Sequence, residues 1–163
     1  MSALMLILLL AITDLAEARL CRGLERAAEF LSTNRFLQRS RTERRELDIP
    51  LADINQARSF AFRFPAFRDL GFGLPNAQSW RRYRGRLESS DLHGRNVGWE
   101  ISNAQGHARV RLDWDEVKGG HYNIEIQRLH NGRNETHRLA VQFQCNNSPC
   151  SRQDVTRLAE SMD

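Results

Sequence analysis

The N-terminal 48 residues constrain the fold most strongly, because their pattern predicts one continuous helix. An uncharged apolar run extends from Met1 to Ile12 and passes, without a proline or an early glycine, into a charged stretch that ends near Asp48. The run is apolar on every side, which is typical of a helix in a membrane or a buried bundle. From Leu15 onward apolar residues recur every three or four positions, which predicts an amphipathic continuation. We therefore expect a stalk over residues 1–48 and a globular domain over residues 49–163.

The apolar run leaves three interpretations of the N-terminus open. A secretory signal peptide fits the run and the Ala16-Glu17-Ala18 cleavage pattern, but no basic residue precedes it. A membrane-spanning helix needs about 20 apolar residues, whereas the first charge here is Asp14. In the third interpretation the chain starts near a processed N-terminus. For packing against a membrane or other helices, the candidate residues are Leu4, Leu6, Leu8, Leu9 and Ile12.

Composition says little about partners. The formal net charge is +4, from 24 basic and 20 acidic residues, and Lys118 is the one lysine. This excess of arginine indicates a coding sequence rich in G and C more than selection for phosphate binding. Charge alone therefore does not identify a partner.

Two of the three cysteines form a pair near the C-terminus. Cys145 and Cys150 enclose the turn-forming sequence Asn-Asn-Ser-Pro, so we expect a disulfide if the chain reaches an oxidising compartment, with free thiols as the alternative. No CxxC or HxxxH motif accompanies them, so we expect no metal site. Cys21 is left without a predicted partner.

From Trp80 onward the hydrophobic period becomes two. Five alternating segments are bounded by turn residues, and Asn131-Gly132 has the composition of a tight hairpin turn. The sequence therefore predicts an antiparallel meander, with these strands: Trp80–Leu87, Val97–Ser102, His107–Trp114, Tyr122–Leu129 and His137–Phe143. A short amphipathic helix is expected over Arg152–Met162. The expected fold class is α+β, a long N-terminal helix packed on an antiparallel sheet.

Pro50 is expected to end the long helix, since the residue before a proline is disfavoured in helical conformation. Between the helix and the sheet, Phe60, Phe62 and Phe64 alternate with smaller or charged residues. This pattern predicts a strand or an extended loop whose rings lie on one side, and such a stripe usually belongs to the core.

The opening Ser2 to Ile12, together with the helix, sheet and cysteine-loop order, resembles the minor pilins of type IV pili and the minor pseudopilins of type II secretion. The resemblance implies a structural subunit of a filament or its tip, with other pilin or pseudopilin subunits as partners. It also implies anchoring in the inner membrane before assembly, with the globular domain in the periplasm or outside the cell. The early glutamate of most such proteins is absent from Met1 to Ile12.

An enzyme is not expected, and no catalytic residue or cofactor is predicted. The histidines fall mostly at predicted turns or strand ends, with no Ser, Cys or carboxylate in a recognisable motif. The acidic residues Asp113, Asp115 and Glu116 surround Trp114 but lack the glycine and ligand count of a calcium loop, so we interpret them as a solvated turn.

The alternative function is a secreted or periplasmic β-rich binding domain, with its signal removed after Ala18. Cations and aromatic rings mix in one segment, which suits a nucleic acid, including DNA, or an acidic glycan. The candidate contacts are Trp80, Arg81, Arg82, Tyr83, Arg84 and Arg86. The competing interpretation is an arginine-rich edge strand whose charges prevent association between sheets.

Overall fold

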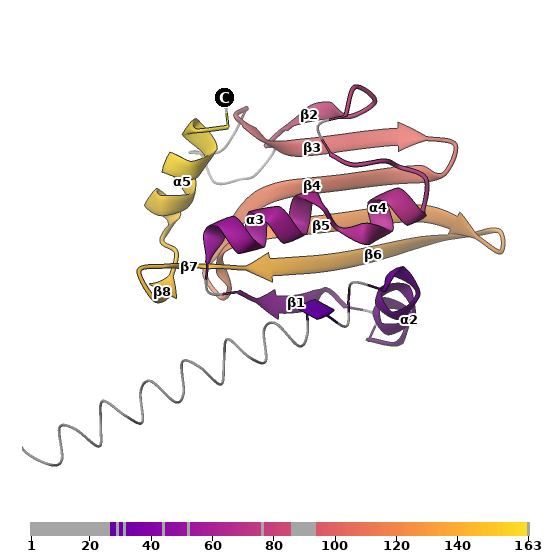
Figure 1. Ribbon diagram of the computed structural model, residues 1–163, viewed down its shortest axis with the longest axis horizontal. Helices are drawn as coiled ribbons and strands as arrows, with labels where there is room; N and C mark the ends of the chain where they lie inside the picture. The colour runs from indigo at the N-terminus through magenta and orange to yellow at the C-terminus, as the bar shows by residue number, and fades with distance from the viewer. Residues whose placement is uncertain are drawn as a thin grey trace, which may run out of the picture.

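A mixed six-stranded sheet forms the centre of the molecule. The computed structural model describes residues 27–28, 30, 32–43, 45–51, 53–75, 77–85 and 94–162. The strand order is β1-β6-β5-β4-β3-β2, and a separate two-stranded ribbon is formed by β7 and β8. Helices α3 and α4 lie across one face of the sheet, α2 lies near one end of β6, and α5 lies at the opposite end (Figure 1).

The predicted antiparallel meander is confirmed. Consecutive strands from β2 to β6 pair antiparallel, and residues of the Asn131-Gly132 turn have positive φ angles of 51° and 74°. Alternation puts Ile124 and Leu139, which are cross-strand partners, on the buried face. The strands are β2 (Arg81–Arg84), β3 (Asn96–Asn103), β4 (Gly106–Asp115), β5 (Gly119–His130), β6 (Arg133–Gln142), β7 (Gln144–Cys145) and β8 (Ser148–Pro149).

The predicted fold class, with a long N-terminal helix on a purely antiparallel sheet, is contradicted. Helix α2 covers only Thr33–Glu43, and strand β1 (Leu47–Pro50) pairs parallel with β6, so the sheet is mixed. The alternation in Leu47–Pro50 explains the difference, because Leu47 and Ile49 are both buried in the core. A helix continued beyond Glu43 through this segment would bury little apolar area, whereas the strand buries the side chains of Leu47 and Ile49.

The predicted strand or extended loop around Phe60 is also wrong, since this region forms α3 (Ile54–Phe62) and α4 (Pro65–Asp69). The Asp53 side chain caps α3 by accepting hydrogen bonds from the amides of Asn55 and Gln56. Pro65 occupies the first turn of α4, where its missing N–H is not needed. These helix-start signals outweigh the short alternation of phenylalanines.

A series of contacts between aromatic rings joins the helices to the sheet. Phe36 of α2 packs edge-to-face on Phe64 at 5.0 Å between ring centroids, and Phe64 packs on Phe67 of α4 at 5.9 Å. Phe67 in turn contacts the Trp80 ring at 5.2 Å. The expectation of core rings holds for Phe64, which is fully buried, whereas Phe60 and Phe62 are partly buried and pack against the core.

No helix in the described part of the chain is long and apolar enough to cross a membrane, which contradicts the predicted inner-membrane localisation. Helix α2 has 11 residues, so at about 1.5 Å per residue it is about half as long as the apolar layer is thick. The candidate packing residues lie outside the described residues: Leu4, Leu6, Leu8, Leu9 and Ile12.

The predicted disulfide between Cys145 and Cys150 is confirmed, and it closes the turn between β7 and β8. The Cys150 carbonyl oxygen accepts a hydrogen bond from Nε1 of Trp114 at 3.2 Å. Helix α5 (Arg152–Glu160) follows, as expected from the sequence, and its Val155 is fully buried. The disulfide loop and α5 therefore cover the same end of the sheet.

Candidate functional site

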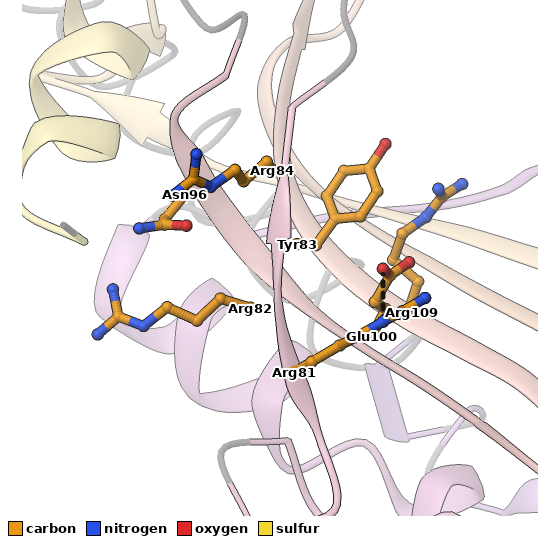
Figure 2. Close-up of a pocket in the computed structure, with 7 residues that line it drawn as sticks. All are labelled: Arg81, Arg82, Tyr83, Arg84, Asn96, Glu100 and Arg109. Carbon is orange, nitrogen blue, oxygen red and sulfur yellow. Dashed lines mark ion pairs between the residues drawn. The ribbon is translucent and has the colours of Figure 1, made fainter.

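A hollow lined mainly by positively charged side chains lies at β2, the last strand of the sheet. A hollow of about 550 Å³ runs along this strand (Figure 2). Its lining has four guanidinium groups and one carboxylate, so its side chains carry a clear excess of positive charge. The lining residues are Arg81, Arg82, Tyr83, Arg84, Asn96, Glu100 and Arg109.

The lining side chains come from both sides of the strand. Arg82 and Arg84 point to one side of β2, together with Asn96, whereas Tyr83 and Arg109 lie on the other side (Figure 2). Successive side chains of a strand alternate between the two faces of a sheet. A hollow lined from both faces therefore follows the edge of the sheet rather than the middle of one face.

Arg109 of β4 is held in place by two contacts. Its guanidinium carbon lies 4.7 Å from the centroid of the Tyr83 ring, and it donates a hydrogen bond to Oε1 of Glu125 at 3.2 Å. Burial raises the pKa of Glu125, but the hydrogen bond from Arg138 and the neighbouring guanidinium charges outweigh burial and lower it. Glu125 therefore stays ionised and holds the Arg109 guanidinium group through this hydrogen bond.

Arg81 forms an exposed ion pair with the lining carboxylate. Its Nε lies 3.0 Å from Glu100, and its side chain is 74% exposed. His107 also approaches Glu100, at 3.5 Å. An exposed pair of this kind contributes about 0–1 kcal/mol. An incoming anion can therefore replace Glu100 as the partner of Arg81 at little cost.

Arg82 and Arg84 differ in their surroundings. Arg82 donates a hydrogen bond to the carbonyl oxygen of Met162 at 2.8 Å and lies 5.5 Å above the Trp99 ring, so it joins β2 to the end of the chain. Arg84 is exposed and has no hydrogen-bonding or ionic partner among the described residues. A ligand at Arg84 would therefore displace no partner among the described residues.

The aromatic residues of the predicted contact segment are not exposed. Trp80 is 4% exposed, and its Nε1 donates to the carbonyl oxygen of Phe72 at 2.9 Å, so it is a core ring. Tyr83 is 6% exposed beneath Arg109. Arg86 lies outside the described residues. Any ligand of the described part of this segment is therefore contacted mainly by arginines.

Sequence reasoning missed three lining residues: Asn96, Glu100 and Arg109. They come from β3 and β4, and the sheet register brings them beside β2, with Arg81 opposite Glu100 and Glu100 opposite Arg109. The only signal in the sequence is the alternation of those strands, which does not fix their register. The site therefore depends on the assembled sheet.

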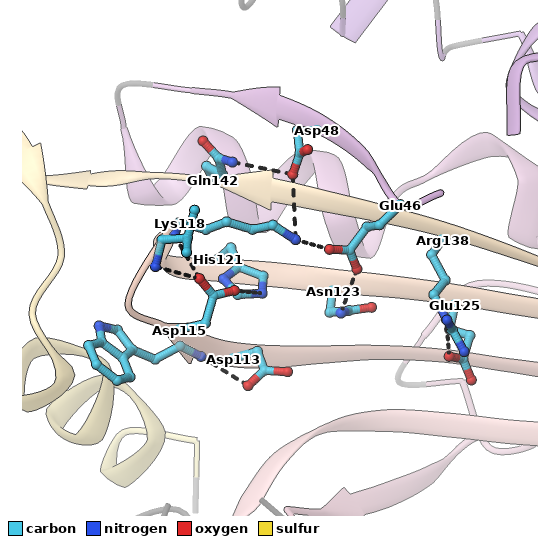
Figure 3. A network of polar contacts seen from close by, with 12 residues as sticks. Glu46, Asp48, Asp113, Asp115, Lys118, His121, Asn123, Glu125, Arg138 and Gln142 are labelled. Carbon is cyan, nitrogen blue, oxygen red and sulfur yellow. Dashed lines mark hydrogen bonds and ion pairs between the residues drawn. The ribbon is translucent and has the colours of Figure 1, made fainter. Parts of the chain in front are cut away.

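A second polar cluster lies near the opposite edge of the sheet (Figure 3). Lys118 contacts Glu46 and lies 3.7 Å from Asp48, and Asn123 donates to Glu46 at 2.9 Å. Burial lowers the pKa of Lys118, and burial raises the pKa of Asp48. Carboxylates outnumber cations in this cluster, and Lys118 is shared by Glu46 and Asp48, so the cluster does not offer free cations to an anionic ligand.

The acidic residues around Trp114 act mainly in local structure. Asp113 pairs with Arg111 at 2.8 Å, and Oδ1 of Asp115 accepts hydrogen bonds from the amides of Val117 and Lys118. In the described part of the chain, no group of three or more His, Cys, Asp or Glu side chains is placed to hold a metal ion.

No family model matches the chain, and no curated protein matches it.

Proposed function

We propose that this protein is a secreted or periplasmic binding module that holds an anionic partner along strand β2. The observation that carries the proposal is the hollow at this strand, which is lined by four guanidinium groups and a single carboxylate. Guanidinium groups form strong, often bidentate hydrogen bonds with carboxylates, phosphates and sulfates. The Cys145–Cys150 disulfide supports an oxidising, extracytoplasmic location.

The competing interpretation is that the arginines only prevent association at a sheet edge. Such protection needs exposed charges on the edge strand itself. Arg109 does not fit this role, because it comes from β4 and its side chain is only 19% exposed. Its position in the lining, held by Glu125, favours a site arranged for a ligand over a simple charged edge.

A filament subunit remains the other prediction. Its candidate packing residues lie outside the described residues, and nothing in the described part bears on filament assembly. The β2 hollow is the feature on which a function can be argued from contacts, and it supports ligand binding.

Fluorescence anisotropy with three labelled polyanions tests the proposal: polyglutamate, a heparin oligosaccharide and single-stranded oligothymidylate. We expect binding of at least one of them in 50 mM salt and a steep loss of affinity as salt rises. About three ionic contacts to oligothymidylate would give a slope of about 2 in log Kd against log salt concentration. No binding of any of the three in 50 mM salt would overturn the proposal.

Arg84→Glu is the variant that locates the site. It replaces an exposed guanidinium by a carboxylate, which has the same sign of charge as the ligand and repels it. We therefore expect affinity to fall about tenfold or more. Arg133→Glu is the matched control, because Arg133 is also exposed but lies at the start of β6, outside the lining. Equal losses in the two variants would show that net charge, and not the β2 hollow, governs binding.

A further inference from the structure

We infer that the anionic partner is an extended acidic segment of another polypeptide, which adds to the sheet as a further strand beside β2. This inference rests on the proposed function and names the class of partner. Three observations support it: the outer edge of β2, to which no described strand pairs, the arginines on both faces of β2, and the burial of the neighbouring aromatic rings.

No strand of the described part of the chain covers the outer edge of β2. Within the described residues β2 is the last strand of the sheet and pairs with β3 alone. The Gly85 amide donates to the Arg95 carbonyl oxygen, and the Gly94 amide donates to that of Gly85, both at 2.9 Å. Because inward and outward amides alternate along an antiparallel strand, the Arg84 amide points away from β3 and toward the open edge.

An added strand would meet cations on both faces of β2. Arg82 and Arg84 lie on one side of β2, and Arg81 extends toward Glu100 on the other side (Figure 2). A strand beside β2 also projects its side chains alternately to both faces, within about 4.5–5.5 Å of the directly opposite residues. Carboxylates at successive positions would therefore meet guanidinium groups on both faces.

The burial of the nearby rings disfavours single-stranded nucleic acid. Binding of single strands relies on aromatic faces on which bases stack. Trp80 and Tyr83 are 4% and 6% exposed, and Arg82 lies over the Trp99 ring. The described part of the hollow thus offers arginines and a strand edge rather than stacking surfaces, and a strand edge supplies ordered hydrogen bonds to a peptide backbone.

A second copy of this chain does not suit the same edge. Pairing β2 with β2 of another molecule would put the arginines of one strand opposite those of the other, and like charges directly opposite are destabilising. Acidic side chains complement this edge instead. Since β2 has four residues, the added segment would make a short contact about 13 Å long, and we expect weak, reversible binding.

The probe is a labelled seven-residue peptide containing four glutamates, with an otherwise identical peptide N-methylated at every residue, and so blocked on both edges, as the control. Both carry the same charge, but the methylated peptide cannot complete a strand ladder. In 50 mM salt we expect the methylated peptide to bind at least tenfold more weakly. We also expect hydrogen exchange of the Arg84 amide to slow at least tenfold when the unmodified peptide is bound.

The protein variants separate charge from backbone pairing. Arg84→Glu should weaken binding of the unmodified peptide about tenfold, and Arg133→Glu should leave it within about twofold. Equal affinity of the two peptides, or no protection of the Arg84 amide, would overturn the strand-addition inference. If oligothymidylate or heparin then still binds and Arg84→Glu weakens that binding, the proposed function stands without this inference. No binding of any polyanion would overturn the proposed function itself.

Discussion

Replacing Phe36 by Ala tests whether α2 is an integral part of the domain. The Phe36 ring is fully buried and lies 6.2 Å from the Phe30 ring, 5.0 Å from the Phe64 ring and 5.9 Å from the His137 ring. A buried phenylalanine removes about 150–250 Å² from water, which at about 25 cal/mol per Å² sets an upper bound of about 4–6 kcal/mol. Measured Phe→Ala substitutions in cores cost about 3–5 kcal/mol, so we expect about 4 kcal/mol.

Urea denaturation followed by circular dichroism measures this loss with the disulfide kept oxidised. With an m-value of about 2 kcal/mol per molar urea, the midpoint should fall by about 2 M. Arg35→Ala is the control, because Arg35 is exposed on the same helix, and its effect should stay within about 0.5 kcal/mol. A loss below about 1 kcal/mol for Phe36→Ala would show that α2 does not pack on the sheet as described.

Two further predictions concern the disulfide and a buried histidine. The Cys145–Cys150 bond spans a sequence separation of 5, and the loop-entropy relation for about six residues gives about 2 kcal/mol. The double variant Cys145→Ala, Cys150→Ala should lose about that free energy of unfolding in urea; an unchanged midpoint would contradict it. Burial lowers the pKa of His137, despite the opposing effect of the Glu135 carboxylate 3.4 Å from its Nε2, so unfolding takes up a proton below about pH 6.5. The contribution of the neutral His137 side chain to the free energy of unfolding is therefore fully present above about pH 6.5 and decreases as pH falls toward the folded-state pKa. The free energy of unfolding of wild type relative to His137→Leu should decrease between pH 6.5 and 5; a constant or rising difference would refute the assignment.

The local signals in the sequence predicted the meander well. Alternation gave the strands from β2 to β6, and Asn131-Gly132 marked a turn whose residues have positive φ angles. The short spacing of Cys145 and Cys150 predicted their disulfide. In each case the partners lie close together along the chain, so residue type and spacing already define the geometry.

The long helix was wrong because periodicity was extended beyond the segment that tertiary contacts support. Helix α2 continues through the polar residues to Glu43, and the predicted continuation fails because Leu47 and Ile49 bury their side chains in strand β1 instead. The Phe60 region was wrong for a related reason, since three alternating rings are too short a pattern to separate a strand from a helix. The Asp53 cap and Pro65 were the signals that identify these helices.

The sequence by itself determined the hairpins, the terminal disulfide and the arginine-rich character of β2, because these depend on neighbours in the chain. Only the tertiary structure decided that β1 joins β6 in parallel, with Leu47 opposite Leu139, and that Arg109 comes to lie beside Tyr83. Both arrangements depend on the register of strands distant in sequence. That register is set by burying one face of the whole sheet under the helices, and no single segment contains this information.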